Sequence, residues 1–200
     1  MEKELELEQN KNALLMAQIQ PHFINNSLMA IRARCSDYPE IYESITNFSM
    51  YLRSNFEALG TAKLITFEQE MDNIEAYLAL EQQNFGDRLN VEYDIGCDDF
   101  MIPALTVQPL VENAVRHGVA AHTGGGTVCI RSFRSGGKII IEVTDESSGE
   151  SSITEHQSKR RGIGIENVRA RLSSMSCGEL EIIHAERGTV ARITMINGNL

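Results

Sequence analysis

One stretch stands out in the sequence: Gln18-Ile19-Gln20-Pro21-His22-Phe23-Ile24-Asn25-Asn26-Ser27-Leu28. Its apolar spacing predicts a helix to about Arg34, and Pro21 interrupts the helix before it because proline removes one backbone hydrogen bond. Asn26 follows His22 by one helical turn, so both side chains share one face. A neutral imidazole is a good nucleophile near neutral pH, and the Asn26 amide is placed to hold its tautomer or orient a water. The alternative, a structural histidine beside a helical proline, stays open from this stretch alone.

The flanking residues predict a helical hairpin. Residues 2 to about 20 are charged with interleaved leucines, which is typical of the end of a long helix. Asp37-Tyr38-Pro39 indicates a turn, and a second helix is predicted from about Glu40 to Leu59. Apolar residues recur along it at helical spacing: Ile41, Ile45, Phe48, Leu52 and Phe56. Because two helices cannot cover this face alone, we expect a homodimer in which two hairpins form a four-helix bundle. Phe23 and Leu28 are expected to be core residues.

The rest of the chain alternates helix and strand signals. Thr66-Phe67-Glu68-Gln69 matches a capping box and begins a third helix that reaches about Phe85. Gly136-Gly137 reads as a hairpin turn between two of five predicted strands. The strands are predicted at 89–95, 127–134, 138–144, 179–184 and 190–195.

Two further helices are predicted in the same part of the chain. Pro103 is expected to open the helix that carries Glu112 and Asn113, and Gly162 to open one that reaches about Met175. The stretch 145–161 is rich in Ser, Glu and Lys and is expected to be a mobile loop. The fold class is therefore α+β, with a helical module over residues 1–62 and a layered α/β domain over residues 63–200.

The composition excludes several classes of protein. The chain has 200 residues, a formal net charge of -10 and 42% hydrophobic residues, so it is an ordinary globular chain without the basic face that nucleic acid requires. No apolar run is long enough to span a bilayer, and the first residues lack the apolar segment of a signal peptide. The four cysteines form no CxxC pair, so reduced thiols are expected.

A second stretch carries further polar residues: Pro109-Leu110-Val111-Glu112-Asn113-Ala114-Val115-Arg116-His117-Gly118. Asn113 offers a neutral oxygen of the kind that Mg²⁺ accepts. Glu112 could polarise a nucleophile or position a metal-bound water. The alternative is a solvated helical face that ends in a glycine cap at Gly118, and the stretch alone does not decide between the two.

Asp145 directly follows the predicted strand at 138–144. A carboxylate at a strand end can accept a hydrogen bond from the exocyclic amine of adenine, and Gly149 would let the backbone bend around the base. In isolation the same residues also fit an acidic surface loop.

Gly162 and Gly164 open a predicted helix, and the amides at such a helix start can bind phosphate. The basic run Lys159-Arg160-Arg161 precedes them. Gly188-Thr189 comes before the last predicted strand, where such a pair most often marks a turn. None of these segments is specific by itself.

An imidazole nucleophile and a magnesium–nucleotide pocket in one chain predict phosphoryl transfer from ATP to His22. The motifs together resemble the LytS/YehU/YesM-like class of sensor histidine kinases. Around its phosphorylated histidine the class carries Gln-Ile-x-Pro-His-Phe-Leu-x-Asn-(Ser/Thr)-Leu, here Gln18 through Leu28, and its N box resembles Gln108 through Gly118. Its Gly-Ile-Gly-Leu-x-Asn-Val-x-x-Arg-Leu element resembles Gly162 through Leu172, and its late Gly-Thr pair matches Gly188-Thr189. The resemblance covers nearly the whole chain in the family's order.

The resemblance implies a helical dimerisation and phosphotransfer module followed by a GHKL (Bergerat) ATP-binding domain, an α/β sandwich that uses ATP and Mg²⁺. It implies that Asn113 binds the metal and that Asp145 contacts adenine. The implied ATP-binding residues are Asn113, His117, Gly118, Asp145, Gly149, Gly162, Gly164, Gly188 and Thr189. Phe23 stands where many other histidine kinases carry an acidic residue, so the implied catalytic residues are His22, Asn26 and Glu112, with Glu112 as the base.

The resemblance further implies a cytoplasmic portion of a membrane sensor, which phosphorylates His22 and passes the phosphoryl group to a response regulator. Ser147 departs from the family pattern, which has glycine there. If the position needs a backbone that only glycine adopts easily, ATP binding is weakened, and we expect it to be weak but real. Two alternatives stay open: a degenerate kinase that acts as a signalling scaffold, and a GHKL protein that switches conformation with ATP without phosphorylating itself.

Overall fold

The computed structural model describes residues 21–58, 63–147, 161–185 and 188–196. The chain divides into two compact units, Met1–Thr61 and Ala62–Leu200, which are described separately below. Within the described ranges, no helix combines the length and the apolar character needed to cross a membrane.

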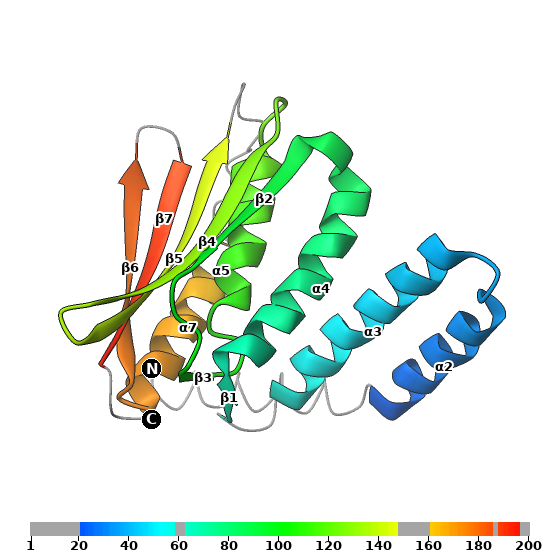
Figure 1. Ribbon diagram of the computed structural model, residues 1–200, viewed down its shortest axis with the longest axis horizontal. Coiled ribbons are helices and arrows are strands. Elements are labelled where there is room, and N and C mark those ends of the chain that lie inside the picture. The colour runs from blue at the N-terminus through cyan, green and yellow to red at the C-terminus, as the bar shows by residue number, and fades with distance from the viewer. Residues whose placement is uncertain (1–20, 59–62, 148–160, 186–187, 197–200) are drawn as a thin grey trace. The chain divides into compact units, whose positions relative to one another are not determined.

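The first unit is the expected helical hairpin. Helix α2 (Pro21–Arg34) and helix α3 (Pro39–Ala58) are joined by a short turn and pack against each other (Figure 1). The helix expected over residues 2–20 lies outside the described residues. One expectation is wrong within this chain: Phe23 is 67% exposed and belongs to no core. Ile41 and Phe48 of the predicted stripe are also exposed, so the hairpin leaves an apolar face uncovered.

The second unit begins with a small sheet and a long helix. Strand β1 (Leu64–Thr66) pairs antiparallel with β3 (Met101–Pro103). Helix α4 (Phe67–Phe85) starts with the predicted capping box, in which the Thr66 hydroxyl accepts from Gln69 N at 3.2 Å and the Gln69 side chain accepts from Thr66 N. A short 3-10 turn, Gly86–Arg88, follows it. Pro103 was expected to open a helix; it ends β3 instead, and the helix begins five residues later.

A five-stranded sheet forms the main layer of this unit, in the order β2-β4-β5-β7-β6. Its strands run over nearly the predicted ranges: β2 (Leu89–Ile95), β4 (Gly126–Ser135), β5 (Lys138–Ser147), β6 (Gly178–Ala185) and β7 (Gly188–Ile196). Strand β2 runs parallel to β4, and every other neighbouring pair is antiparallel. Gly136 and Gly137 have φ angles of 58° and 75°, which fits the predicted hairpin turn between β4 and β5.

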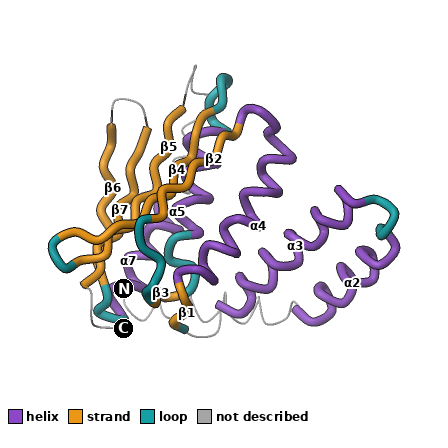
Figure 2. The backbone as a smooth tube through the Cα atoms, viewed as in Figure 1, coloured by secondary structure: helices purple, strands orange, loops and turns teal. Residues whose placement is uncertain are grey.

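Helices α4, α5 (Gln108–Asn113) and α7 (Arg161–Ser174) cover one face of this sheet (Figures 1 and 2). The core lies between the helices and the inward side chains of the strands. On β5 these inward positions are Ile139, Ile141 and Val143, each almost completely buried, and the next is Asp145, 7% exposed. Asp145 was expected just after the strand. It instead lies inside β5, where a carboxylate takes the place of an apolar core residue.

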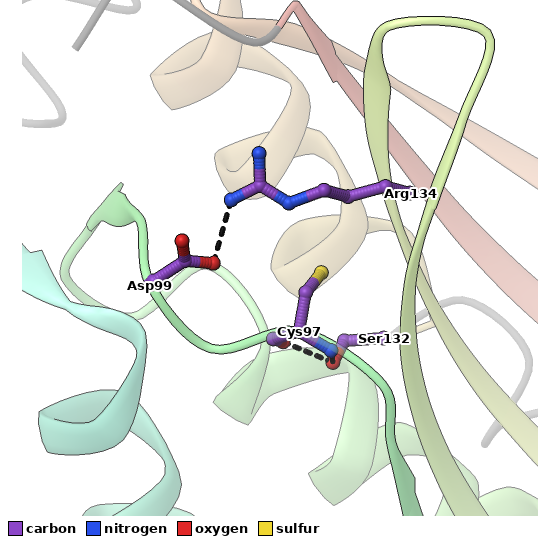
Figure 3. A network of polar contacts seen from close by, with 4 residues as sticks. All are labelled: Cys97, Asp99, Ser132 and Arg134. Carbon is purple, nitrogen blue, oxygen red and sulfur yellow. Dashed lines mark hydrogen bonds and ion pairs between the residues drawn. The ribbon is translucent and has the colours of Figure 1, made fainter.

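The connection between β2 and β3 is fastened to β4 by side-chain contacts (Figure 3). The Ser132 hydroxyl donates to the backbone carbonyl of Cys97, and Arg134 forms an ion pair with Asp99 at 2.6 Å. The Arg134 hydrogen bond and charge hold the pKa of Asp99 below its usual range. These contacts fix the chain just before it enters β3 and the loop that leads to α5.

Candidate functional site

The second predicted stretch folds as two kinds of helix in succession. Helix α5 carries Pro109 in its first turn, where a missing N–H costs nothing. The chain then continues as a wider π-helix, Ala114–Val119, in which Ala120 N donates to the carbonyl of Val115, five residues back, at 2.8 Å. Asn113 and His117, on either side of this change, line the same cavity.

Asp145 is held tightly at its inward position on β5. One carboxylate oxygen accepts a hydrogen bond from Thr189 N at 3.0 Å, across the register that pairs these two residues. A Cβ on Gly118 would lie 2.5 Å from Cβ of Asp145. Gly188 has a φ angle of 116°, and a Cβ there would collide with the Asp145 carbonyl. Glycine is therefore required at both positions for the carboxylate to sit where it does.

The cavity has a volume of about 380 Å³, within the size range of small-molecule sites. Four residues expected from the sequence line it: Asn113, His117, Asp145 and Thr189. Sequence reasoning missed the others, which are Leu110, Ala114, Val143, Ile165, Glu166, Arg169, Ile182, His184 and Ala191. Helical spacing after Gly162 could have indicated Ile165, Glu166 and Arg169; no local signal marked His184, which reaches the site by pairing with Thr189.

The remaining predicted nucleotide residues are glycines. Gly118 and Gly188 lie against Asp145, and a Cβ on Gly164 would be 3.5 Å from the Asn113 amide nitrogen. These three glycines therefore border the cavity's polar residues. Gly162 lies in the first turn of α7. Gly149 lies outside the described residues.

The predicted base, Glu112, is not among the residues that line the cavity. Its carboxylate accepts a hydrogen bond from the Gln108 side chain at 3.0 Å. Glu112 precedes Asn113 on α5, so it lies beside the site on a different part of the helix surface.

The Asn113 amide nitrogen is buried and has no hydrogen-bond partner in the structure. A buried polar atom without a partner is costly, and such an atom at a cavity wall is typical of a group that meets a ligand. Within the described ranges no three His, Cys, Asp or Glu side chains gather into a metal-binding cluster. A cation here would therefore depend on the Asn113 amide oxygen together with oxygens from a ligand and from water, which is the usual situation of nucleotide-bound Mg²⁺.

Ser147 does not require the backbone of a glycine. It ends β5 in extended conformation opposite Gly126, whereas left-handed backbone among the described non-glycine residues occurs at Leu105 and Ser176. The residue that must be glycine here is Gly126, because its Cβ would lie 2.9 Å from Cα of Ser147. The expectation that serine at this position strains the loop is therefore wrong for residue 147 itself.

In the first unit, His22 lies exposed on α2. The Asn26 amide nitrogen lies 3.2 Å from Nδ1 of His22 and 3.5 Å from Nε2. The predicted one-turn pairing is therefore formed, and it allows Asn26 to influence which ring nitrogen carries the proton.

Two families of known proteins match this chain. Residues 10–89 match the family described as histidine kinase, and residues 100–197 match the family of histidine kinase-, DNA gyrase B-, and HSP90-like ATPases. The first match contains the hairpin with His22, and the second contains the whole cavity.

Individual histidine kinases are also similar to this chain. The chain is 36% identical to the sensor histidine kinase YpdA of Escherichia coli (strain K12) over 88% of its length, and 30% identical to the sensor histidine kinase YesM of Bacillus subtilis (strain 168) over 98%. It spans about a third of the length of these curated relatives, 32% and 34%. A crystal structure of the histidine kinase ThkA in complex with the response regulator protein TrrA matches with a TM-score of 0.50 at 13% identity, covering 99% of this chain and 64% of ThkA. At that identity the likeness concerns the fold alone.

Proposed function

The chain belongs to the sensor histidine kinase family of the LytS and YesM type, and we propose that it transfers the γ-phosphoryl group of ATP to the His22 imidazole. The observation that carries this proposal is the cavity of the second unit. Asn113, His117, Asp145 and Thr189 line it together; Gly118 leaves room for the buried Asp145 side chain, and Gly188 leaves room for the Asp145 backbone carbonyl.

In the proposed complex Asp145 accepts a hydrogen bond from the exocyclic amine of adenine. Thr189 N holds the carboxylate for this role, since it donates to one carboxylate oxygen at 3.0 Å. The desolvated position strengthens the contact, because hydrogen bonds to a charged group gain in a low-dielectric site. The amides at the start of α7, at Gly162 and Gly164, lie on the side of the phosphates.

The Asn113 amide oxygen would hold Mg²⁺, which when bound would neutralise charge on the phosphate oxygens. His117 and Gly118 follow on the π-helix and complete this wall of the cavity, with Gly149 assigned to the site by the family pattern. The work of the protein is then mainly positioning, as in other phosphoryl transfers.

At His22, the lone pair of one ring nitrogen forms the N–P bond while the bond from the γ-phosphorus to the β–γ bridging oxygen breaks and ADP leaves. The other ring nitrogen then sheds its proton. Asn26 sets the tautomer from its position 3.2 Å from Nδ1, and Glu112 is the proposed proton acceptor. The Gln108 bond to Glu112 limits how freely that carboxylate moves.

We further propose a homodimer through the hairpin and a response regulator as the acceptor of the phosphoryl group. The uncovered apolar side chains of α2 and α3 support the dimer, since a patch of this kind marks an interface. We also propose that this chain is the cytoplasmic portion of a larger membrane sensor; its curated relatives are sensor histidine kinases about three times as long.

The test is incubation with Mg²⁺ and ATP labelled at the γ-phosphate. The parent chain should acquire acid-labile label, and both His22→Ala and Asn113→Ala should acquire none, the latter because metal-dependent ATP binding is lost. Label that persists in His22→Ala would contradict the assignment. ATP binding without labelling would favour a GHKL protein that switches conformation with ATP, and no ATP binding would favour a degenerate kinase that acts as a signalling scaffold. Mixing the two variants shows whether transfer occurs between protomers.

A further inference from the structure

Helix α5 begins without any local cap. Its N-terminal flanking residue is Val107, which has no side-chain hydrogen bond to offer the first turn. The first amides of a helix have no partner within it and must be satisfied from outside, especially when they are buried. Thr106, Val107 and Gln108 are all completely buried, so this helix start needs a partner from elsewhere in the fold.

That partner is Glu70 of α4, a carboxylate with no exposed surface. One oxygen accepts from Leu105 N at 2.9 Å, and the other accepts from Thr106, Val107 and Gln108 N at 2.8, 2.9 and 3.1 Å. Burial raises the pKa of Glu70, and these four hydrogen bonds act in the opposite direction. Four donors directed at two oxygens fit the ionised form, whose charge also lies at the positive end of α5.

Arg171 of α7 binds the same loop from its carbonyl side. Its guanidinium donates to the carbonyl oxygens of Ala104 and Leu105, the second at 3.0 Å. Burial lowers the pKa of Arg171, while the charge of Glu70 raises it. Leu105 between them has a φ angle of 56°, a left-handed backbone that is strained for a residue with a side chain and persists only where its surroundings hold it.

Gly164, Val168 and Arg171 lie on one face of α7, at the spacing of successive turns. At one end of this face, Gly164 lies against Pro109 and the Asn113 amide. At the other end, Arg171 holds the loop that starts α5. Helix α7 therefore contacts the α5 segment near Asn113 through Gly164, and contacts the start of α5 through Arg171, which binds the loop that Glu70 also holds.

We propose that Glu70 and Arg171 are positioning residues of the nucleotide site, which set α5 against α7 and so place Asn113 for the metal. This inference rests on the proposed function, because it concerns how the metal-dependent part of ATP binding is built. Neither residue lines the cavity, so they act indirectly, through the loop 104–107 and the first residue of α5.

The experiment measures ATP affinity with Mg²⁺ and with EDTA, and takes the ratio of the two dissociation constants. In Arg171→Met we expect this ratio to fall at least tenfold, while the affinity in EDTA, which reports the Asp145 contact, changes little. Arg171→Lys keeps a donor for the carbonyls and should recover most of the ratio. Arg192→Met is the matched control, because Arg192 is a partly buried arginine of the same unit that makes a side-chain contact of its own, an ion pair with Glu142 at 2.7 Å, but lines no part of the cavity. A general loss of stability would lower the melting temperature without changing the ratio.

If folded Arg171→Met shows the same ratio of ATP dissociation constants, with Mg²⁺ and with EDTA, as the parent chain, the inference is overturned. If that variant does not fold, Arg171→Lys and Glu70→Gln carry the comparison, and unchanged ratios in both would overturn it equally. Failure of the proposed function looks different, since the parent itself would then bind no Mg–ATP. In that case hydrogen exchange of the free chain decides. The amides of α5 and residues 114–119 should exchange at least tenfold faster in Arg171→Met than in Arg192→Met, and equal rates would refute a positioning role for Arg171.

Discussion

The two proposed reacting regions of this protein are built in opposite ways. His22 lies on α2, a helix with no buried residue, and its ring contacts the side chain of Asn26 on the same helix. Asp145 is nearly buried in the centre of a sheet, with a backbone donor from β7 and glycines packed against it. A side chain that must be reached by another domain or protein has to be exposed, whereas a side chain that must recognise one base has to be held in a single position. Changes to the sheet unit should therefore be far more damaging than changes to the hairpin.

The largest effect is expected from Gly118→Ala. The new Cβ would lie 2.5 Å from Cβ of Asp145, so the π-helix or β5 must shift, at a cost of about 1–3 kcal/mol. ATP affinity should fall by about a hundredfold or more, measured by calorimetric titration. Gly137→Ala is the control, because its Cβ meets nothing within 4 Å and only the left-handed turn suffers. Equal ATP affinity in both variants would show that Asp145 is not held as tightly as its contacts indicate.

A smaller effect, confined to the other region, is expected from Phe48→Glu. Phe48 is 41% exposed on α3, and a charge there should oppose association of two hairpins. The dimer dissociation constant, measured by sedimentation, should rise at least tenfold, or by about 1.4 kcal/mol, while ATP affinity stays unchanged. Glu43→Gln, an exposed change on the same helix, is the control. A chain that is monomeric before any substitution would contradict the proposed dimer.

Asn26→Ala should have a still smaller effect. Loss of one exposed hydrogen bond to His22 is worth about 1 kcal/mol, so the rate of His22 labelling should fall about fivefold at saturating ATP. ATP affinity should not change, because the cavity residues are untouched. A complete loss of label would mean that the His22 site depends on side-chain positioning as strongly as the buried Asp145 site does, and the two regions would then not differ in this respect.

The smallest effect is expected from Ser147→Gly. Because Ser147 already has an extended backbone opposite Gly126, removing its side chain relieves no strain, and ATP affinity should change less than about twofold. Ser176→Gly, at a position with a φ angle of 49°, should stabilise the chain instead, by up to about 1 kcal/mol, because glycine adopts this left-handed backbone without a steric penalty. Tighter ATP binding in Ser147→Gly would show that the loop beyond β5 needs the glycine of the family pattern.

Most of the fold follows from local patterns. The five strands lie within a few residues of their predicted ranges because each alternates or clusters apolar residues between turn signals, and Thr66 with Gln69 marks the start of α4 without outside help. Asp145 could have been placed inside its strand by the same logic, since it continues the inward series of Ile139, Ile141 and Val143.

The start of α5 could not be predicted in this way. Pro103 is a reasonable first residue of a helix, but its neighbours pair with β1, and the helix begins where Glu70 meets the chain. That carboxylate is 38 residues before Gln108 in the sequence, so no local pattern contains the information. The π-helix after Asn113 and the position of His184 at the cavity also depend on tertiary packing, so local sequence patterns do not predict them.

The Glu70 contacts also bear on how such proteins can be recombined. Helix α4 follows the hairpin after only the short strand β1 and could be mistaken for a connector, yet it supplies the buried carboxylate on which α5 starts. A chimaera that joins the hairpin of one relative to the sheet unit of another must therefore keep α4 with the sheet it serves, with the junction before Leu64. A junction placed after Phe85 would pair a foreign α4 with the native α5, and a poor fit there would disable the ATP site of a protein whose every cavity residue is native.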